Sequence, residues 1–203
     1  MIPHWRAGLV VLLFLAACDS GPPKLAKLPA DAVVLAFGDS LTFGTGAGAE
    51  ASYPAVLQEL IGRRVVRAGV PGEVTAQGLA RLPGAIAAAQ PNLLVLIHGG
   101  NDLLQRKSPQ RIAANLRAMV QMARERGVAV VLIGVPNLGL ILGRSAGFYQ
   151  DLAEELDLHY DGEALPAILI QPNLKSDAIH PNAKGYRKLA EAVAELLRKS
   201  GAI

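Results

Sequence analysis

Short apolar runs along the chain alternate with longer segments in which apolar residues recur every three or four positions. The runs at 32–37, 93–97 and 128–133 are apolar almost throughout. Such runs are typical of strands that are buried on both faces of a parallel sheet. Shorter strands are predicted at 64–67 and 158–160.

The segments between these runs have helical periodicity. Helices are predicted at 54–61, 74–89, 109–126, 149–156 and 182–199. Alternating strands and helices indicate βαβ units and a parallel sheet that is covered on both faces. The sequence therefore predicts an α/β fold: a three-layer α/β/α domain with a doubly wound parallel sheet of about five strands.

Two further segments have neither period, and both are predicted to be loops. One is 134–148, which is rich in glycine, and the other is 166–177. With 203 residues, of which 51% are hydrophobic and 18% are charged, the chain is long enough for one well-packed domain and too short for two.

The N-terminus is different in character. Arg6 precedes a short apolar run that ends in Leu15-Ala16-Ala17-Cys18, which is typical of an export signal and too short for a membrane span. These last four residues resemble the lipobox of bacterial lipoproteins, in which the cysteine is lipidated. We therefore expect a signal peptide at 1–17, a lipidated Cys18 with a tether at 18–30, and the folded domain at 31–203.

The cysteine count and the charge fit this organisation. Cys18 is the single cysteine, so no disulfide can form within the chain, although an ordinary secretory signal with an incidental cysteine remains an alternative. Removing 1–17 takes away Arg6 alone and changes the balance of basic to acidic residues from 20:17 to 19:17, which does not favour a nucleic-acid partner. The expected location is a membrane, by lipid anchor, facing the periplasm or the cell exterior.

A serine follows the first predicted strand. Ser40 lies in Gly38-Asp39-Ser40-Leu41, where open α/β sheets have their ligand crevice. Gly, Asp and Ser also favour turns and helix N-termini for local backbone reasons. Ser40 therefore indicates catalysis only if other residues of the chain can act as its chemical partners.

A possible base stands near the other end of the chain, in Asp177-Ala178-Ile179-His180-Pro181. A carboxylate three residues before a histidine can bind its Nδ1, which leaves Nε2 free to take a proton from a hydroxyl. The alternative is a helix N-cap region in which Asp177 and His180 only satisfy backbone groups.

Acyl transfer by serine also needs hydrogen-bond donors for the developing oxyanion. Candidates are the amide of Ser40, the amide of Gly72 in a turn where a side chain would block approach, and the carboxamide of Asn101. Taken singly, Gly72 is more typical of a plain turn glycine, and Asn101 of a turn dipeptide with Gly100.

Together, these blocks resemble those of the SGNH hydrolases, also called GDSL esterases. The blocks are Gly38 to Leu41, Gly72, Gly99 to Asp102 and Asp177 to Pro181, and the segment Gln77 to Pro83 is similar to the bacterial thioesterase I, lysophospholipase and arylesterase branch. The resemblance implies a flavodoxin-like sheet and no metal or organic cofactor. It also implies that Ser40 is the nucleophile, His180 the base, Asp177 its orienting partner, and Ser40, Gly72 and Asn101 the oxyanion donors.

The function expected from this resemblance is hydrolysis of carboxylic esters or thioesters, including lysophospholipids, through an acyl-enzyme. The predicted substrate-binding residues are Asp39, Leu41, Pro136, Leu138, Leu140 and Ile179. The apolar stretch that contains Leu138 and Leu140 is equally consistent with an acyl-chain groove and with a loop packed into the core. Two other functions remain open: deacetylation of cell-surface carbohydrate, and a lipid-anchored binding protein without catalysis.

Overall fold

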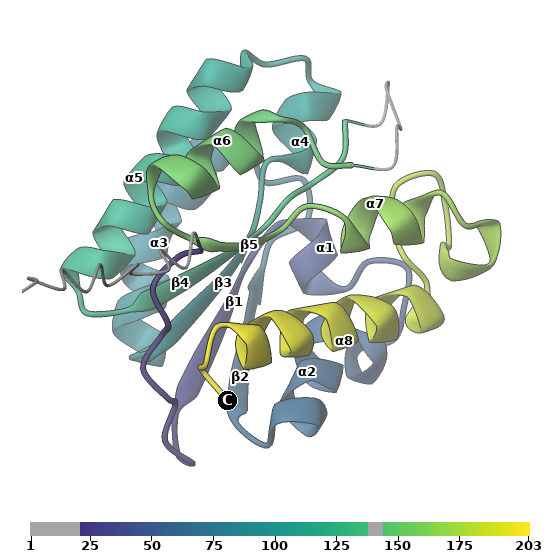
Figure 1. The fold of residues 1–203 in the computed structure, drawn as a ribbon. Coiled ribbons are helices and arrows are strands. Elements are labelled where there is room, and N and C mark those ends of the chain that lie inside the picture. Colours follow the sequence, from purple (N-terminus) through teal and green to yellow (C-terminus); the bar gives the residue numbers. More distant parts are fainter. Residues whose placement is uncertain (1–20, 138–143) are drawn as a thin grey trace, which may run out of the picture.

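A computed structural model of the protein describes residues 21–137 and 144–203. Its centre is a five-stranded sheet in the order β2-β1-β3-β4-β5, in which all neighbouring pairs are parallel (Figure 1). The strands are β1 (Val33–Gly38), β2 (Arg64–Gly69), β3 (Leu93–Ile97), β4 (Ala129–Ile133) and β5 (His159–Asp161). The predicted fold class and number of strands are confirmed.

Helices cover both faces of the sheet. The helices α3 (Thr75–Ala89) and α5 (Pro109–Glu125) pack against each other on one face, while α2 (Tyr53–Ile61) and α8 (Ala183–Lys199) pack against each other on the other (Figure 1). α6 (Phe148–Glu155) packs beside α5. All five were predicted from the sequence. The apolar side of α8 is buried as predicted, through Tyr186, Leu189, Ala190, Val193, Leu196 and Leu197.

One predicted loop is wrong. The segment 166–177 lies mostly in α7 (Ala164–Leu169) and in a 3-10 turn, η3 (Pro172–Leu174). Two prolines concealed this helix, but one of them occupies its first turn, where a missing N–H costs nothing. Leu165, Ile168 and Leu169 are buried, so burial of an apolar face stabilises a helix that is too short to form alone.

Within the described residues, three other short helical turns were not predicted. They are α1 (Ser40–Phe43), η1 (Ala49–Ala51) and α4 (Gly100–Leu104). Each spans at most five residues, which is less than two turns of periodic sequence, so no apolar period could reveal them. Two of them follow β1 and β3 directly and therefore carry residues of the predicted site.

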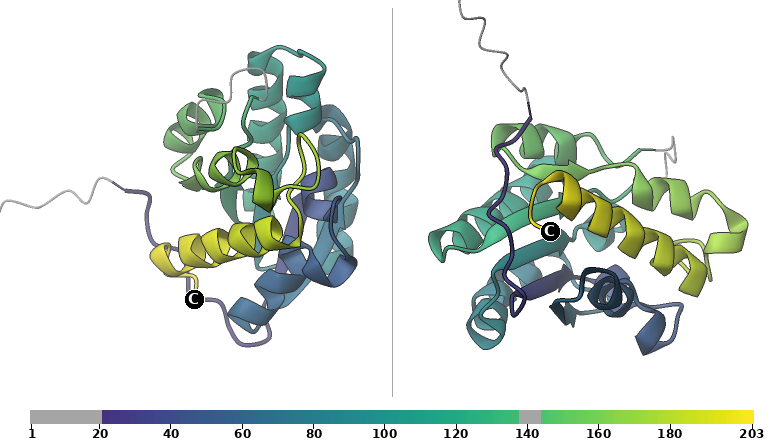
Figure 2. Two further views of the ribbon diagram at one scale, coloured as in Figure 1. Left: turned by 90° about the vertical axis from the view of Figure 1, so that its right-hand side faces the viewer. Right: turned by 60° about the horizontal axis from the view of Figure 1, so that its bottom comes forward.

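The segment predicted to be a tether lies against the domain. The backbone amides of Leu25 and Leu28 each donate to carbonyl groups near the C-terminus, those of Ser200 and Ala202, at 2.8 Å. Leu28 is 6% exposed, and Arg63 donates to its carbonyl oxygen. Figure 2 shows this N-terminal segment running beside the end of α8. The folded part therefore begins before Ala30, contrary to the sequence-based boundary.

The strand order determines where a ligand crevice forms. The chain passes from β1 to β2 on one side and then returns to place β3 on the other side of β1. In such sheets the crevice opens beyond the carboxyl ends of the two strands at which the direction reverses. Here these strands are β1 and β3, which are followed by α1 and α4.

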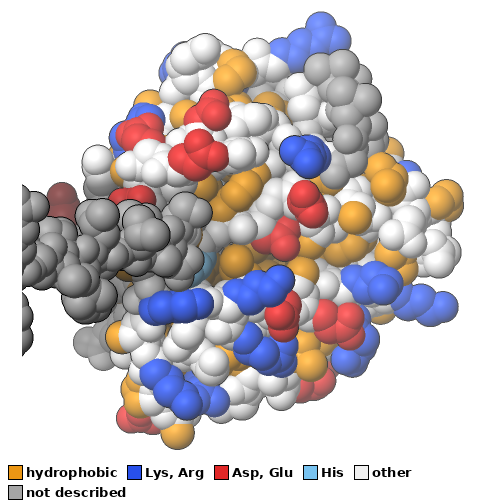
Figure 3. All heavy atoms as spheres, viewed as in Figure 1, with side chains coloured by type: hydrophobic (Ala, Val, Ile, Leu, Met, Phe, Trp, Pro, Cys, Tyr) orange, Lys and Arg blue, Asp and Glu red, His pale blue; other side chains and the backbone are white. Residues whose placement is uncertain are grey.

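The surface in Figure 3 carries both signs of charge. Lys and Arg side chains lie among Asp and Glu side chains across this face, including along α8, and the described part of this face has no continuous basic area. Among residues 21–137 and 144–203, no helix is both long and apolar enough to cross a membrane.

Candidate active site

Ser40 is the first residue of α1, and a single residue, Asp39, separates it from the end of β1. The preceding Asp39 is the N-cap residue, and its Oδ1 accepts a hydrogen bond of 3.1 Å from the amide of Leu41. Asp39 is 1% exposed, and this burial raises the pKa of its carboxyl group. The turn therefore holds Ser40 at the carboxyl edge of the sheet with its own backbone N–H outside the hydrogen-bond pattern of the helix.

Asp177 and His180 lie in a closed loop before α8. The loop is held by backbone bonds from Ser176 N to His180 O and from Asn182 N to Leu174 O, at 3.0 and 2.9 Å. Asn182 is the N-cap of α8, since its side chain accepts from two amides of the first turn. The chain thus presents the histidine at a fixed loop-to-helix junction, as the sequence predicts.

The sequence left open whether Asp177 binds the His180 ring or only satisfies backbone amides, and its carboxylate does both. Its Oδ1 accepts from the amides of Ile179 and His180, each at 2.8 Å, and its Oδ2 lies 2.8 Å from His180 Nδ1. Burial acts to raise the pKa of Asp177, but these three hydrogen bonds outweigh burial and lower the pKa. The carboxylate is therefore ionised at neutral pH, and it faces the ring nitrogen that must carry a proton.

The structure brings two distant parts of the chain, the turn with Ser40 and the loop with His180, into contact. His180 Nε2 lies 3.0 Å from Ser40 Oγ, although 140 positions separate the two residues in the sequence. Since Nδ1 donates to Asp177, Nε2 is the unprotonated nitrogen and can accept the hydroxyl proton of Ser40. The arrangement can therefore generate a serine nucleophile at neutral pH.

The two other predicted donors lie on neighbouring segments. Gly72 has a φ of +79°, which favours glycine, although an added Cβ would meet no protein atom within 4 Å. Asn101, the second residue of α4, donates one hydrogen of its carboxamide nitrogen to the carbonyl of Glu73 at 2.9 Å. This nitrogen carries a second hydrogen, which can serve a substrate oxygen.

A pocket opens beside Ser40 and His180. Of the predicted substrate-binding residues, Asp39, Leu41, Pro136 and Ile179 line it, while Leu138 and Leu140 lie outside the described residues. Sequence reasoning missed four other lining residues: Gly100, Leu104, Val135 and Leu169. Most of the lining is apolar, as expected for a site that binds part of an organic acyl group.

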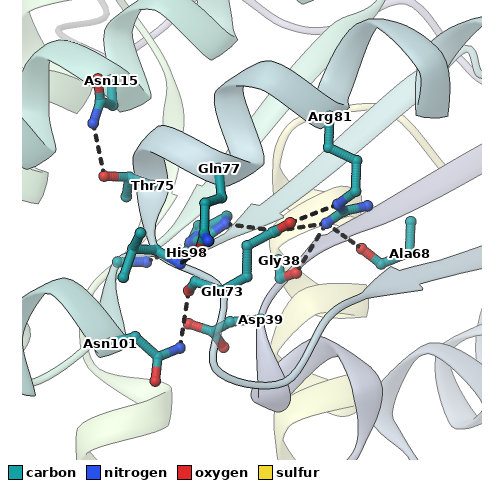
Figure 4. Close-up of polar contacts among 12 residues, drawn as sticks. Gly38, Asp39, Ala68, Glu73, Thr75, Gln77, Arg81, His98, Asn101 and Asn115 are labelled. Atoms are coloured by element: carbon teal, nitrogen blue, oxygen red, sulfur yellow. Dashed lines mark hydrogen bonds and ion pairs between the residues drawn. The ribbon is translucent and has the colours of Figure 1, made fainter.

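Sequence reasoning also missed three residues directly behind this site. Glu73, Arg81 and His98 join in a single hydrogen-bonded cluster, and Glu73 and His98 are buried (Figure 4). The available signal was a histidine at the end of an apolar strand, together with oppositely charged residues on each side of a helix N-terminus. Neither signal identifies the pairing, because the partners are 8 and 25 residues apart.

The switch-point crevice and the contact between serine and histidine define a serine hydrolase built on a doubly wound parallel sheet. Residues 36–188 match the model of the GDSL-like lipase/acylhydrolase family. The chain belongs to this family and is a hydrolase that acts on ester bonds. The predicted family is confirmed.

Three known proteins illustrate the similarity. Esterase TesA of Pseudomonas aeruginosa is 30% identical, covering 86% of this chain and 92% of that protein. Thioesterase 1/protease 1/lysophospholipase L1 of Escherichia coli is also 30% identical, covering 81% of this chain and 83% of that protein. The crystal structure of AlinE4, an SGNH-hydrolase family esterase, aligns with a TM-score of 0.65 at 33% identity, covering 86% of this chain and 98% of that one.

Proposed function

We propose that the protein hydrolyses carboxylic esters or thioesters of small organic molecules through an acyl-enzyme formed on Ser40. One observation supports this most directly: Ser40 Oγ, His180 and Asp177 form a continuous hydrogen-bonded line with contacts of 3.0 and 2.8 Å. A turn serine without catalytic use has no need of a histidine whose tautomer is set by a carboxylate.

The proposed reaction has two steps. His180 Nε2 takes the Ser40 proton while Oγ forms a bond to the substrate carbonyl carbon, and the oxyanion accepts hydrogen bonds from Ser40 N, Gly72 N and Asn101 Nδ2. The carbon–oxygen or carbon–sulfur bond then breaks, and the leaving alcohol or thiol receives the proton from His180. Water, deprotonated by the same nitrogen, attacks the acyl-enzyme and restores Ser40.

Asp177 keeps its charge throughout this cycle. It holds Nδ1–H and stabilises the imidazolium that forms when Nε2 takes the proton. No side chain other than His180 is required to move a proton, because the same nitrogen faces both the nucleophile and the leaving group.

Labelling with a fluorophosphonate tests the assignment of Ser40. The wild-type protein should gain one phosphonyl group on Ser40 and lose p-nitrophenyl butyrate hydrolysis in parallel. Ser40→Ala should remain unlabelled, with a loss of activity of about 10⁴-fold or more. Full labelling of Ser40→Ala would contradict the proposal, and a matched melting temperature would show that the variant is folded.

We also propose that the protein is an exported lipoprotein, anchored through Cys18. The support is the sequence of residues 1–18, together with the position of the nearby Pro23, whose carbonyl oxygen lies 3.1 Å from His159 Nε2 at the beginning of β5. This contact lies at the amino edge of the sheet, so an anchor there would leave Ser40 at the opposite edge. Replacement of Cys18 by Ser should release the protein from the membrane fraction; retention there would contradict lipidation.

A further inference from the structure

A buried carboxylate lies directly behind the oxyanion donors. Glu73 is 6% exposed, and its two carboxylate oxygens accept hydrogen bonds of 2.7 Å from Arg81 Nε and Nη2. His98, which is fully buried at the end of β3, contacts the same carboxylate at 3.1 Å (Figure 4). The mechanism proposed above uses none of these three side chains, so their arrangement needs a separate explanation.

Glu73 connects the segments that carry the three donors. Its own amide follows Gly72 in the chain, and its carbonyl accepts the carboxamide of Asn101 at 2.9 Å. Its partner Arg81 also donates to Gly38 O at 3.3 Å, directly before the turn that carries Ser40. Glu73 and its partner Arg81 together therefore link the three segments that follow β1, β2 and β3.

The hydrogen bonds of His98 determine the tautomer of its imidazole. The amide of Gly99 donates to His98 Nδ1 at 2.9 Å, so the hydrogen of the neutral ring lies on Nε2 and is donated to Glu73. The ring also packs on α3, where a Cβ at Gly78 would lie 2.3 Å from Nε2. His98 thus ties the Glu73 carboxylate to the end of β3, three residues before Asn101.

The carboxylate is charged despite its burial. Burial acts to raise the pKa of Glu73, but the hydrogen bonds from Arg81 and His98 outweigh burial and bring the pKa to about 2. Charge-assisted hydrogen bonds of this kind are about twice as strong as neutral ones, and removing one partner of a buried set is costly. The cluster is therefore a rigid link rather than an adjustable one.

We propose that Glu73 is a positioning residue for the oxyanion hole: through Arg81 and His98 it fixes Gly72 N and Asn101 Nδ2 relative to Ser40. The inference rests on the proposed function. Donors that are aligned before the reaction stabilise the transition state because they need no reorganisation when negative charge develops. Loosening Glu73 should therefore lower kcat and leave KM nearly unchanged, since ground-state binding in the pocket uses other residues.

Glu73→Gln tests this with little change in volume. The carboxamide keeps one acceptor but turns an N–H₂ group toward Arg81 or His98, both of which are donors. We expect kcat for p-nitrophenyl butyrate to fall by about 10- to 100-fold and KM to change by less than about threefold. Each rate is normalised to the sites that a fluorophosphonate titrates, so loss of folded protein cannot imitate the effect.

The chain offers a matched control. Glu155 accepts the same bidentate pair of bonds from Arg117, but on the surface between α5 and α6, with 48% of its side chain exposed. Glu155→Gln should leave kcat within about twofold of wild type, because exposed ion pairs contribute little. A kcat for Glu73→Gln that also stays within twofold, with full titration, overturns the inference.

A double-variant cycle tests whether Glu73→Gln lowers kcat through Asn101. If Glu73 acts by positioning Asn101 and its neighbours, Glu73→Gln should cost at least about threefold less in an Asn101→Ala background than in wild type. Equal costs in both backgrounds overturn the inference. If Glu73→Gln does not fold, Arg81→Lys serves instead, because lysine keeps the charge but cannot hold Glu73 and Gly38 O together.

The same experiment separates this inference from the proposed function. A wild-type protein that neither hydrolyses the ester nor is labelled at Ser40 refutes the function. An active wild-type protein with an unaffected Glu73→Gln variant refutes only the positioning role.

Discussion

The two halves of the catalytic centre are built in opposite ways. The half that moves protons lies near the surface: the side chain of Asp177 is 51% exposed, and its bonds go to residues two and three positions along the chain. The half that holds the oxyanion donors rests on Glu73, which is 6% exposed and is bound to partners 8 and 25 positions away. One half is a local loop, and the other is a buried tertiary cluster.

This difference follows from what each half must do. A histidine that takes and returns a proton needs one orienting partner and space to contact both nucleophile and leaving group, which a short loop supplies. Donors on three separate loops must be held within a few tenths of an ångström of one another. Backbone bonds within one loop cannot do that, so a buried cluster of residues that together contact all three loops is required.

The largest effect that separates the two halves is expected for Asp177→Asn. The asparagine oxygen can still accept from Ile179 N and His180 N, but its N–H₂ group faces Nδ1. The imidazole then favours the tautomer with a hydrogen on Nε2, which cannot accept the Ser40 proton. We expect kcat to fall by about 10²- to 10³-fold, more than for Glu73→Gln, because proton transfer itself fails.

Steady-state kinetics at pH 7.5 checks this, with Ser176→Ala as the control in the same loop. Ser176 Oγ contacts the His180 carbonyl only at 3.3 Å, so its loss should change kcat by less than about threefold. An Asp177→Asn variant with kcat close to that of Ser176→Ala would mean that the carboxylate only shapes the loop.

The same division explains what the sequence could predict. The strands and the long helices follow from apolar periods, and Asp177 and His180 stand three residues apart before a helix start, so local rules describe them. Ser40 and His180 could be paired only by family resemblance, since 140 residues separate them. No local signal identifies the pairing within the Glu73 cluster, because its geometry exists only after β1, β2 and β3 are side by side.

Two errors at the edge of the fold have the same physical cause. The segment 166–177 was predicted as a loop, and residues up to Pro29 as a tether, because neither has a clear period. Both are ordered by tertiary contacts: α7 by burial of its leucines, and the N-terminal segment by backbone bonds to Ser200 and Ala202. Local propensity is a weak predictor wherever burial decides the structure.

A smaller effect, on stability rather than rate, should sharpen the comparison further. The pKa of Glu73 is about 2 in the folded protein against 4.5 as its ordinary value, so its ionised form stabilises the fold above about pH 4.5. That contribution is lost as the pH falls from 4.5 toward 2.

At pH 6, Glu73→Gln should be about 1–3 kcal/mol less stable than wild type to urea, and the difference should shrink at pH 3. Asp177→Asn should show a smaller difference at both pH values, because its half-exposed carboxylate is screened by water. A Glu73→Gln difference that stays constant between pH 6 and pH 3 would show that the charge of Glu73 does not hold the cluster together.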